Sequence, residues 1–97
     1  MKDLTHLQLE KPPEILVYAT NTDLCDDAFR NGVKRKKKTF IELYENEDDA
    51  RRKVRKKQAF LFAVMTEMMA EDGYNFYHAE TGEWLTDELP KKYIRFY

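Results

Sequence analysis

The first half of the chain alternates short apolar runs with turn-forming residues, which predicts short strands joined to one helix. Leu4 to Leu9 alternates imperfectly and predicts a strand. Pro12-Pro13 ends it, because proline has no N–H to donate to a strand ladder. The apolar, β-branched run from Ile15 to Ala19 predicts a buried strand. A helix is expected over 21–31, with Gly32 as its stop.

The second half begins with an alternating segment, Thr39 to Tyr44, which predicts a strand with two different faces. Asn46 is a favourable helix N-cap, and the helix that it starts is expected to run to about Lys57. The most apolar run, Ala59 to Met65, predicts the central strand. Further elements follow in order: a short helix or turn over 66–72 and strands around 75–79, 83–85 and 93–96. Two to three short helices among six or seven strands indicate an α+β domain with an antiparallel-rich sheet.

The 97 residues suffice for one domain with one modest core, which we expect to cover 1–97. The net charge of −1 conceals an uneven distribution, since 11 of the 17 basic residues lie within 34–57. A basic segment in an acidic frame can steer an anionic partner to one side. We therefore expect RNA or nucleotide phosphate to contact this segment, through Lys34, Arg35, Lys36, Lys37, Lys38, Arg51, Arg52 and Arg55.

Several other classes of protein are disfavoured by the sequence. Cys25 is the only cysteine, so no intrachain disulfide can form. No apolar run approaches the roughly 20 residues of a membrane span, and the N-terminus lacks a signal-peptide core. His6 and His78 are isolated, so we expect no metal site. These features predict a cytoplasmic protein without a membrane anchor.

The segment Gly73 to Ile94 carries a resemblance to a known family. Its aromatic residues flank a Glu-Thr-Gly turn, and Pro90 precedes Tyr93. This order resembles the closing segment of the RNA 2′-phosphotransferase (KptA-like) family, whose fold is that of the ADP-ribosyltransferases. Upstream, Pro12 to Thr20 resembles the family's Pro-Pro, strand and Tyr-His-Gly-Thr segment, and Thr39 to Tyr44 resembles its Val-His-Leu-Ser strand. The similarity spans roughly 7–95 and implies a split-sheet fold and NAD as a cofactor.

The resemblance also implies which residues would carry the chemistry, and most of them differ from the family. The family histidines fall on Tyr18 and Glu42, and its arginines fall near Lys38 and Lys57. A tyrosine cannot take a proton near neutral pH as histidine can, and lysine lacks the bidentate fork of arginine. By this comparison the cofactor-binding candidates are Tyr18, Thr20, Lys38 and Lys57, and the catalytic candidates are Glu83 and Glu42. The family's N-terminal RNA-binding lobe is expected to be absent, or to be supplied by a separate chain.

Each candidate has a plainer structural interpretation. Glu83 either orients a ribose hydroxyl or is a solvated residue of a Thr-Gly-Glu turn. Glu42 either lies in a cleft with a raised pKa or pairs with a lysine of 34–38. Tyr18 and Thr20 either line a nucleotide pocket or pack in the core.

Three functions are therefore compatible with the sequence. The first is a divergent, non-catalytic domain that binds a nucleotide or RNA phosphate. The second is an active NAD-dependent transferase with reassigned residues, and the third is a protein interaction module. The first is preferred, because scaffold residues are retained where reactive ones are replaced.

Overall fold

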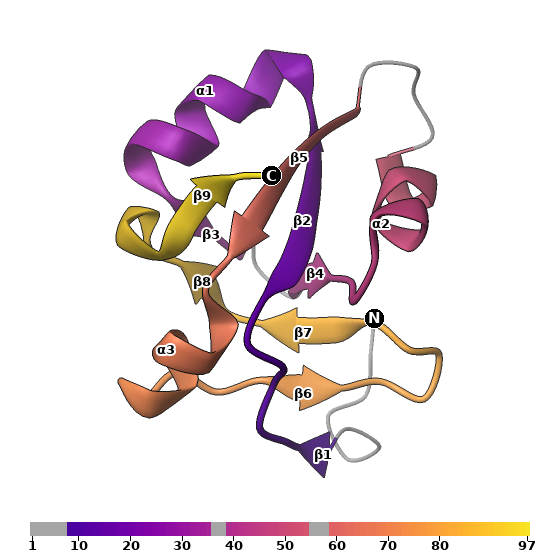
Figure 1. The fold of residues 1–97 in the computed structure, drawn as a ribbon, viewed down its shortest axis with the longest axis vertical. Helices are drawn as coiled ribbons and strands as arrows, with labels where there is room; N and C mark the ends of the chain where they lie inside the picture. Colours follow the sequence, from indigo (N-terminus) through magenta and orange to yellow (C-terminus); the bar gives the residue numbers. More distant parts are fainter. Residues whose placement is uncertain (1–7, 36–38, 55–58) are drawn as a thin grey trace.

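The computed structural model describes residues 8–35, 39–54 and 59–97. Within these ranges it contains nine strands, three α-helices and one 3-10 turn (Figure 1). In chain order the elements are β1 (Gln8–Leu9), β2 (Leu16–Asn21), α1 (Thr22–Asn31), β3 (Val33–Lys34), β4 (Ile41–Leu43), α2 (Glu47–Val54), β5 (Ala59–Val64), α3 (Thr66–Glu71), β6 (Tyr77–His78), β7 (Trp84–Thr86), β8 (Glu88–Leu89), η2 (Lys91–Tyr93) and β9 (Ile94–Phe96).

The strands form a split antiparallel sheet. One part has the order β2-β5-β9, the second β1-β6-β7-β4, and β3 pairs with β8. The first two parts meet at one bridge, where Val17 and Tyr44 exchange backbone hydrogen bonds of 2.7 and 2.9 Å. The expected α+β class is confirmed. The β3–β8 pair was not predicted, because two-residue strands are too short to show a hydrophobic period.

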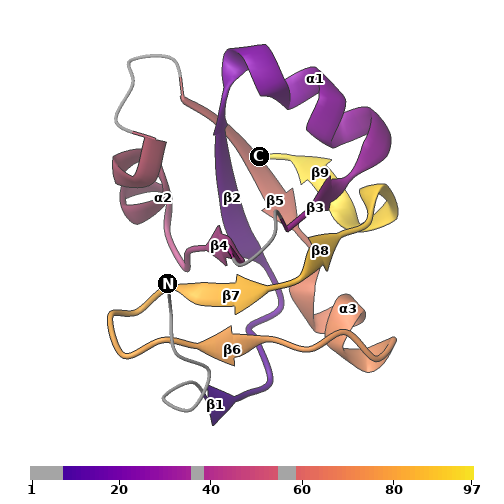
Figure 2. The ribbon, with the colours of Figure 1, turned by 180° about the vertical axis from the view of Figure 1, so that it is seen from behind.

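The three-stranded part separates α1 from α2 (Figures 1 and 2). Because neighbouring side chains of a strand point to opposite faces, Phe60 and Phe62 face the α1 side, where Phe62 meets Phe29. Leu61 faces the other side and packs with Val17 and with Ala50 of α2. The apolar run of β5 is thus explained by burial on both faces, and its predicted central position is confirmed.

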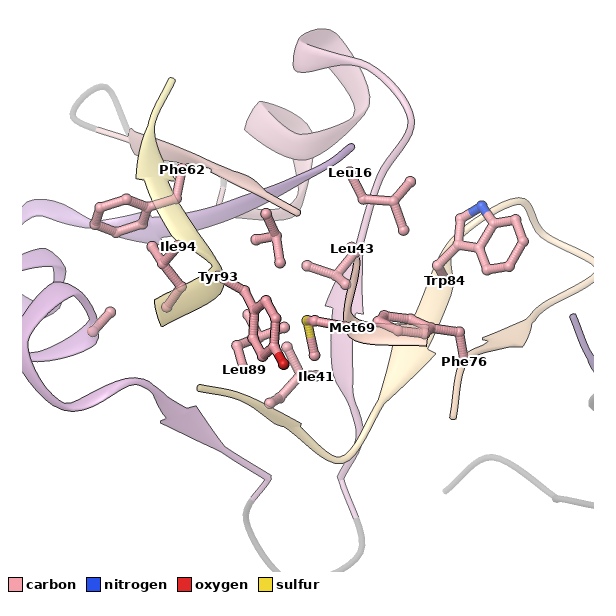
Figure 3. Packing of buried hydrophobic residues seen from close by; sticks show 12 residues of the cluster. Leu16, Ile41, Leu43, Phe62, Met69, Phe76, Trp84, Leu89, Tyr93 and Ile94 are labelled. Atoms are coloured by element: carbon pink, nitrogen blue, oxygen red, sulfur yellow. The ribbon is translucent and has the colours of Figure 1, made fainter. Parts of the chain in front are cut away.

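The larger core lies between the two parts of the sheet, and Figure 3 shows it from close by. It includes Phe62 of β5, Leu43 of β4, Trp84 of β7 and Met69 of α3. Ile94 closes this core from the start of β9. Trp84 is buried, so its indole belongs to this core.

Local signals place α2 and β4, which carry several candidate residues. The Asn46 side chain accepts a hydrogen bond of 2.9 Å from the Asp49 backbone N–H, so the predicted N-cap of α2 is confirmed. Ile41 and Leu43 of β4 are buried, while Glu42 between them lies half-buried on the opposite face, as the alternation predicted. No helix in the described ranges is long and apolar enough to cross a bilayer.

Candidate functional site

A pocket of about 290 Å³ opens between β2, β3 and the start of β4, and we call it the Tyr18 pocket. It brings together two of the predicted residues, Tyr18 and Glu42, with two basic residues, Lys34 and Arg35. Its lining residues in the described part of the chain are Tyr18, Ala19, Val33, Lys34, Arg35, Thr39, Phe40, Ile41 and Glu42. Aromatic rings, cations and a carboxylate thus share one open, largely apolar pocket, which is typical of small-molecule sites.

Tyr18 is positioned by its own strand. Residues 18 and 20 lie on the same face of β2. Burial raises the pKa of the Tyr18 phenol, and the neighbouring Thr20 side chain only partly opposes this effect. Thr20 is itself buried, with 7% of its surface exposed. Thr20 is therefore a buried neighbour of Tyr18 on the same strand face, and it is not among the residues that line the pocket.

Glu42 is held by a residue that sequence reasoning did not select, Tyr44. The Tyr44 hydroxyl donates a hydrogen bond of 3.2 Å to Oε1 of Glu42, two positions earlier on the same strand face. The pKa of Tyr44 is raised, first by burial, then by the charge of Glu42 and its hydrogen bond, and further by the charge of Glu83. Tyr44 thus lies between the two carboxylates proposed from sequence. The i, i+2 spacing on an alternating strand was the signal that could have identified it.

Glu83 lines a second pocket, also of about 290 Å³, which we call the Glu83 pocket. Glu83 as a whole is 8% exposed, so its interpretation as a solvated turn residue is wrong. The reason is that the turn 79–83 folds back on itself, with the Ala79 N–H donating to the Glu83 carbonyl. The Thr81 hydroxyl lies 2.7 and 2.6 Å from the two Glu83 oxygens. Tyr44 also lines this pocket, together with Asp49 and Arg52 of α2 and Gly82.

The two pockets keep Tyr18 and Glu83 apart. Tyr18 lines the first and Glu83 the second, while Glu42 and Tyr44 lie on the strand between them. A single site that used both Tyr18 and Glu83 would have to extend across β4.

The predicted basic segment is only partly described. Arg35 forms an ion pair of 3.0 Å with Asp87, and its guanidinium lies 4.5 Å from the centroid of the Phe40 ring. Each of the two α2 arginines at 51 and 52 pairs with a carboxylate of the same helix. Lys36, Lys37, Lys38, Arg55 and Lys57 lie outside the described residues, so their predicted contacts stay predictions.

His78 is not isolated, contrary to expectation. Its ring stacks on Trp84 with centroids 4.1 Å apart, and its Nδ1 lies 2.8 Å from Oε2 of Glu10. Oε2 of Glu45 accepts a hydrogen bond of 2.9 Å from the Trp84 indole N–H and lies 3.9 Å from Nε2 of His78. These partners could not be foreseen, because they come from segments far apart in the sequence. Among the described residues no group of His, Cys, Asp and Glu side chains could hold a metal ion.

Comparison with known proteins gives one consistent result. The profile described as "RNA 2'-phosphotransferase, Tpt1 / KptA family" matches residues 1–88. The chain is 29% identical over 90 residues to a "Probable RNA 2'-phosphotransferase" of Pseudomonas fluorescens, covering 92% of this chain and 50% of that protein. It is 31% identical over 88 residues to a protein of the same name from Flavobacterium johnsoniae, covering 89% of this chain and 48% of that protein. The chain spans about half the length of the curated relatives it matches. On the extent of the profile match, the chain belongs to the RNA 2′-phosphotransferase family.

Proposed function

We propose that this domain binds a nucleotide or an RNA phosphate in the Tyr18 pocket and that it does not itself catalyse transfer. The observation that carries this proposal is the convergence of rings and cations in one open pocket. Tyr18 and Phe40 offer faces for a base or a nicotinamide ring, and Lys34 and Arg35 offer charge for a phosphate.

The pairing of Arg35 with Asp87 is compatible with phosphate binding. A guanidinium has five N–H donors, and the Asp87 carboxylate accepts from Nη1 of Arg35. Contact with Phe40 fixes the plane of the group and leaves other donors for a ligand. Asp87 therefore acts as a positioning residue for Arg35, and the cation is ordered before a phosphate arrives.

The pocket suits part of a dinucleotide rather than a whole one. Its volume of about 290 Å³ is at the lower end of the range for small-molecule sites, roughly 300–1,000 Å³. NAD, when bound, supplies an ADP-ribosyl group through cleavage of its bond to nicotinamide. The residues of this pocket fit a ring and a phosphate of such a molecule. The remainder would extend over the rim of the pocket.

The lack of catalysis follows from the proton chemistry of the residues present. Burial raises the pKa of Tyr18, so its phenol keeps its proton at neutral pH and is no general base. One oxygen of Glu42 already accepts a hydrogen bond from Tyr44. These residues can hold and orient a ligand, and the proposal gives neither of them the role of the base that the family's histidine would supply.

The proposal is tested by titrating the purified protein with NAD and with ADP-ribose while following backbone amide shifts by NMR. Saturable shifts are expected at Tyr18, Ala19, Lys34, Arg35 and around Phe40. Lys34→Gln combined with Arg35→Gln should abolish them. Lys11→Gln, which changes an exposed cation paired with Glu67, should leave them unchanged. No shift at millimolar ligand would overturn the proposal and favour a protein interaction module.

A second candidate function is an active NAD-dependent transferase, and the buried position of Glu83 favours it. Glu83, Thr81 and Tyr44 place a carboxylate and two hydroxyls around one pocket, where they can orient a ribose hydroxyl. This function requires that the domain cleave NAD. It could do so alone or together with a second chain that corresponds to the part of the relatives that this chain does not match. Glu83→Gln should then reduce turnover without changing the denaturation midpoint. If NAD stays intact in the presence of 2′-phosphorylated RNA, both with the domain alone and with such a second chain, this second function is wrong.

A further inference from the structure

The outer edge of β9 carries a cluster of exposed aromatic side chains that neither pocket uses. Phe96 is 64% exposed, Tyr97 61% and Phe29 of α1 38%. The rings of Phe29 and Phe96 stack with centroids 4.4 Å apart and an interplanar angle of 23°. Contiguous exposed aromatic surface on a small protein marks a contact site more often than single scattered residues do.

The position of β9 leaves this cluster accessible. The strand order is β2-β5-β9, so β9 is an edge strand, and within the described residues it pairs only with β5. Figures 1 and 2 show β9 at the border of the sheet, with the C-terminus at its end and α1 beside it. Because side chains alternate along a strand, Phe96 lies on the face toward α1, where its ring meets Phe29, and Arg95 lies on the opposite face. Tyr97 follows directly after the strand.

Three cations accompany the rings: Lys91, Lys92 and Arg95. All three are exposed, and within the described residues none lies within 4.0 Å of a carboxylate. Nη1 of Arg95 donates hydrogen bonds of 2.6 and 3.0 Å to the carbonyls of Lys92 and Ile94, which fixes the guanidinium against its own backbone.

Two acids of α1 near this surface already have partners. Asp26 pairs with Arg30 at 3.2 Å, and Asp27 accepts a hydrogen bond of 2.8 Å from Asn31. The predicted phosphate-binding arginines differ, since Arg35, Arg51 and Arg52 each have a carboxylate partner. Positive charge without an ion-pair partner among the described residues therefore gathers near β9, beside the exposed rings, although Lys92 also lies over the Tyr93 ring at 5.1 Å.

We propose that this surface, formed by Phe29, Lys91, Lys92, Arg95, Phe96 and Tyr97 and called the β9 surface, binds single-stranded RNA. Bases stack on the exposed rings, and the cations contact the phosphates, as in other sites for single strands. The site lies outside both pockets, so it does not depend on nucleotide binding in the Tyr18 pocket.

Charge decides between RNA and a second copy of this chain as the occupant. Antiparallel pairing of two β9 edges about a twofold axis at Arg95, the central residue of the strand, would place the Arg95 of one copy opposite that of the other. Like charges placed opposite each other destabilise a strand pair. A phosphate backbone instead neutralises them and releases its counterions, which favours binding.

The test uses a fluorescein-labelled oligouridine of 10 nucleotides and fluorescence anisotropy at several salt concentrations. The charge variant is Lys91→Gln/Lys92→Gln/Arg95→Gln. Its control, Lys11→Gln/Arg30→Gln, removes charge from two positions that each pair with a carboxylate and lie outside both pockets and the basic segment. Each phosphate contact contributes roughly −0.7 to the slope of log affinity against log salt for single strands. Loss of three contacts should therefore make this slope less negative by about 2. The control should keep the wild-type slope.

The aromatic contribution is tested separately with Phe96→Ala and Tyr97→Ala. Loss of one stacked base should weaken binding by about fivefold or more. Tyr97→Ala serves as the second variant, because Phe96→Ala also removes the stack with Phe29. Denaturation midpoints identify variants that fail to fold. NAD binding by the charge variant should remain as in the wild type, which separates this proposal from the Tyr18 pocket.

Four results would overturn the proposal. The first is that oligouridine does not bind at about 50 mM salt, and the second is that the charge variant binds RNA like its control. The third is that both alanine variants bind RNA like the wild type. The fourth is that a polyglutamate peptide competes for the surface as well as RNA does. Sedimentation that shows a dimer dissociated by Phe96→Ala would assign the surface to a second copy instead.

Discussion

Gly32 offers the sharpest test of the structure, because two independent constraints exclude a side chain there. Its backbone has φ 76° and ψ −175°, a region that essentially only glycine occupies. A Cβ at this position would also lie 2.6 Å from the Leu89 carbonyl oxygen and 3.0 Å from the Lys91 nitrogen. Both of these neighbours are backbone atoms, so a clash cannot be relieved by a side-chain rotation.

The expected effect of Gly32→Ala can be worked out from these constraints. The backbone conformation costs roughly 1–3 kcal/mol for alanine. Moving the β3–β8 pair apart sacrifices at least one hydrogen bond, worth about 0.5–1.5 kcal/mol. The free energy of unfolding should therefore fall by about 3 kcal/mol, and Tm by roughly 12–24 °C for a domain of this size. Because Val33 to Arg35 line the Tyr18 pocket, ligand binding there should weaken as well.

Gly73→Ala is the matched control, measured by urea denaturation followed by circular dichroism. Gly73 also has a positive φ, 104°, but nothing lies within 4 Å of the position that a Cβ would take. Gly73→Ala should therefore lower the free energy of unfolding only by the cost of its backbone conformation, roughly 1–2 kcal/mol. If Gly32→Ala were no more destabilising than Gly73→Ala, the close approach of α1 to the β8–η2 segment would be refuted.

Three further predictions concern side chains. The pKa of Tyr44 is raised in the folded state, so the folded protein keeps this proton while the unfolded chain loses it above about pH 10. The free energy of unfolding should thus fall as pH rises above about 10. In Tyr44→Phe this fall should be less steep than in the wild type. The difference should be under ~1.4 kcal/mol per pH unit, because the group is partly exposed, and urea denaturation at each pH measures it. Ala50→Leu should destabilise the protein by about 1–3 kcal/mol, because Ala50 is fully buried between α2 and the sheet; an unchanged midpoint would contradict that packing. Trp84→Phe should lower the free energy of unfolding, followed by circular dichroism, by about 1–2 kcal/mol. The reason is that the hydrogen bond to Glu45 disappears and the smaller ring leaves a gap. An unchanged free energy of unfolding would exclude that hydrogen bond as a stabilising contact.

The sequence by itself determined most elements whose residues carry a strong local signal. β5 is a continuous apolar run, α2 has its cap at Asn46, and β4 alternates, and each was predicted within a few residues. The order of these elements and the closing aromatic segment also indicated the family. Such features depend on neighbours in the chain, so a local pattern is sufficient to identify them.

Only the tertiary structure decided how the candidate residues are grouped. Tyr18 and Glu42 share a pocket because β2 and β4 meet at a single bridge, while Glu83 is buried because its turn folds against Tyr44 and α2. The compensation of charges is equally non-local, since Arg35 pairs with a residue 52 positions away and the cations near β9 have no acidic partner among the described residues. Burial and ion pairing depend on which segments meet in space, and sequence spacing does not encode this for short strands joined by loops.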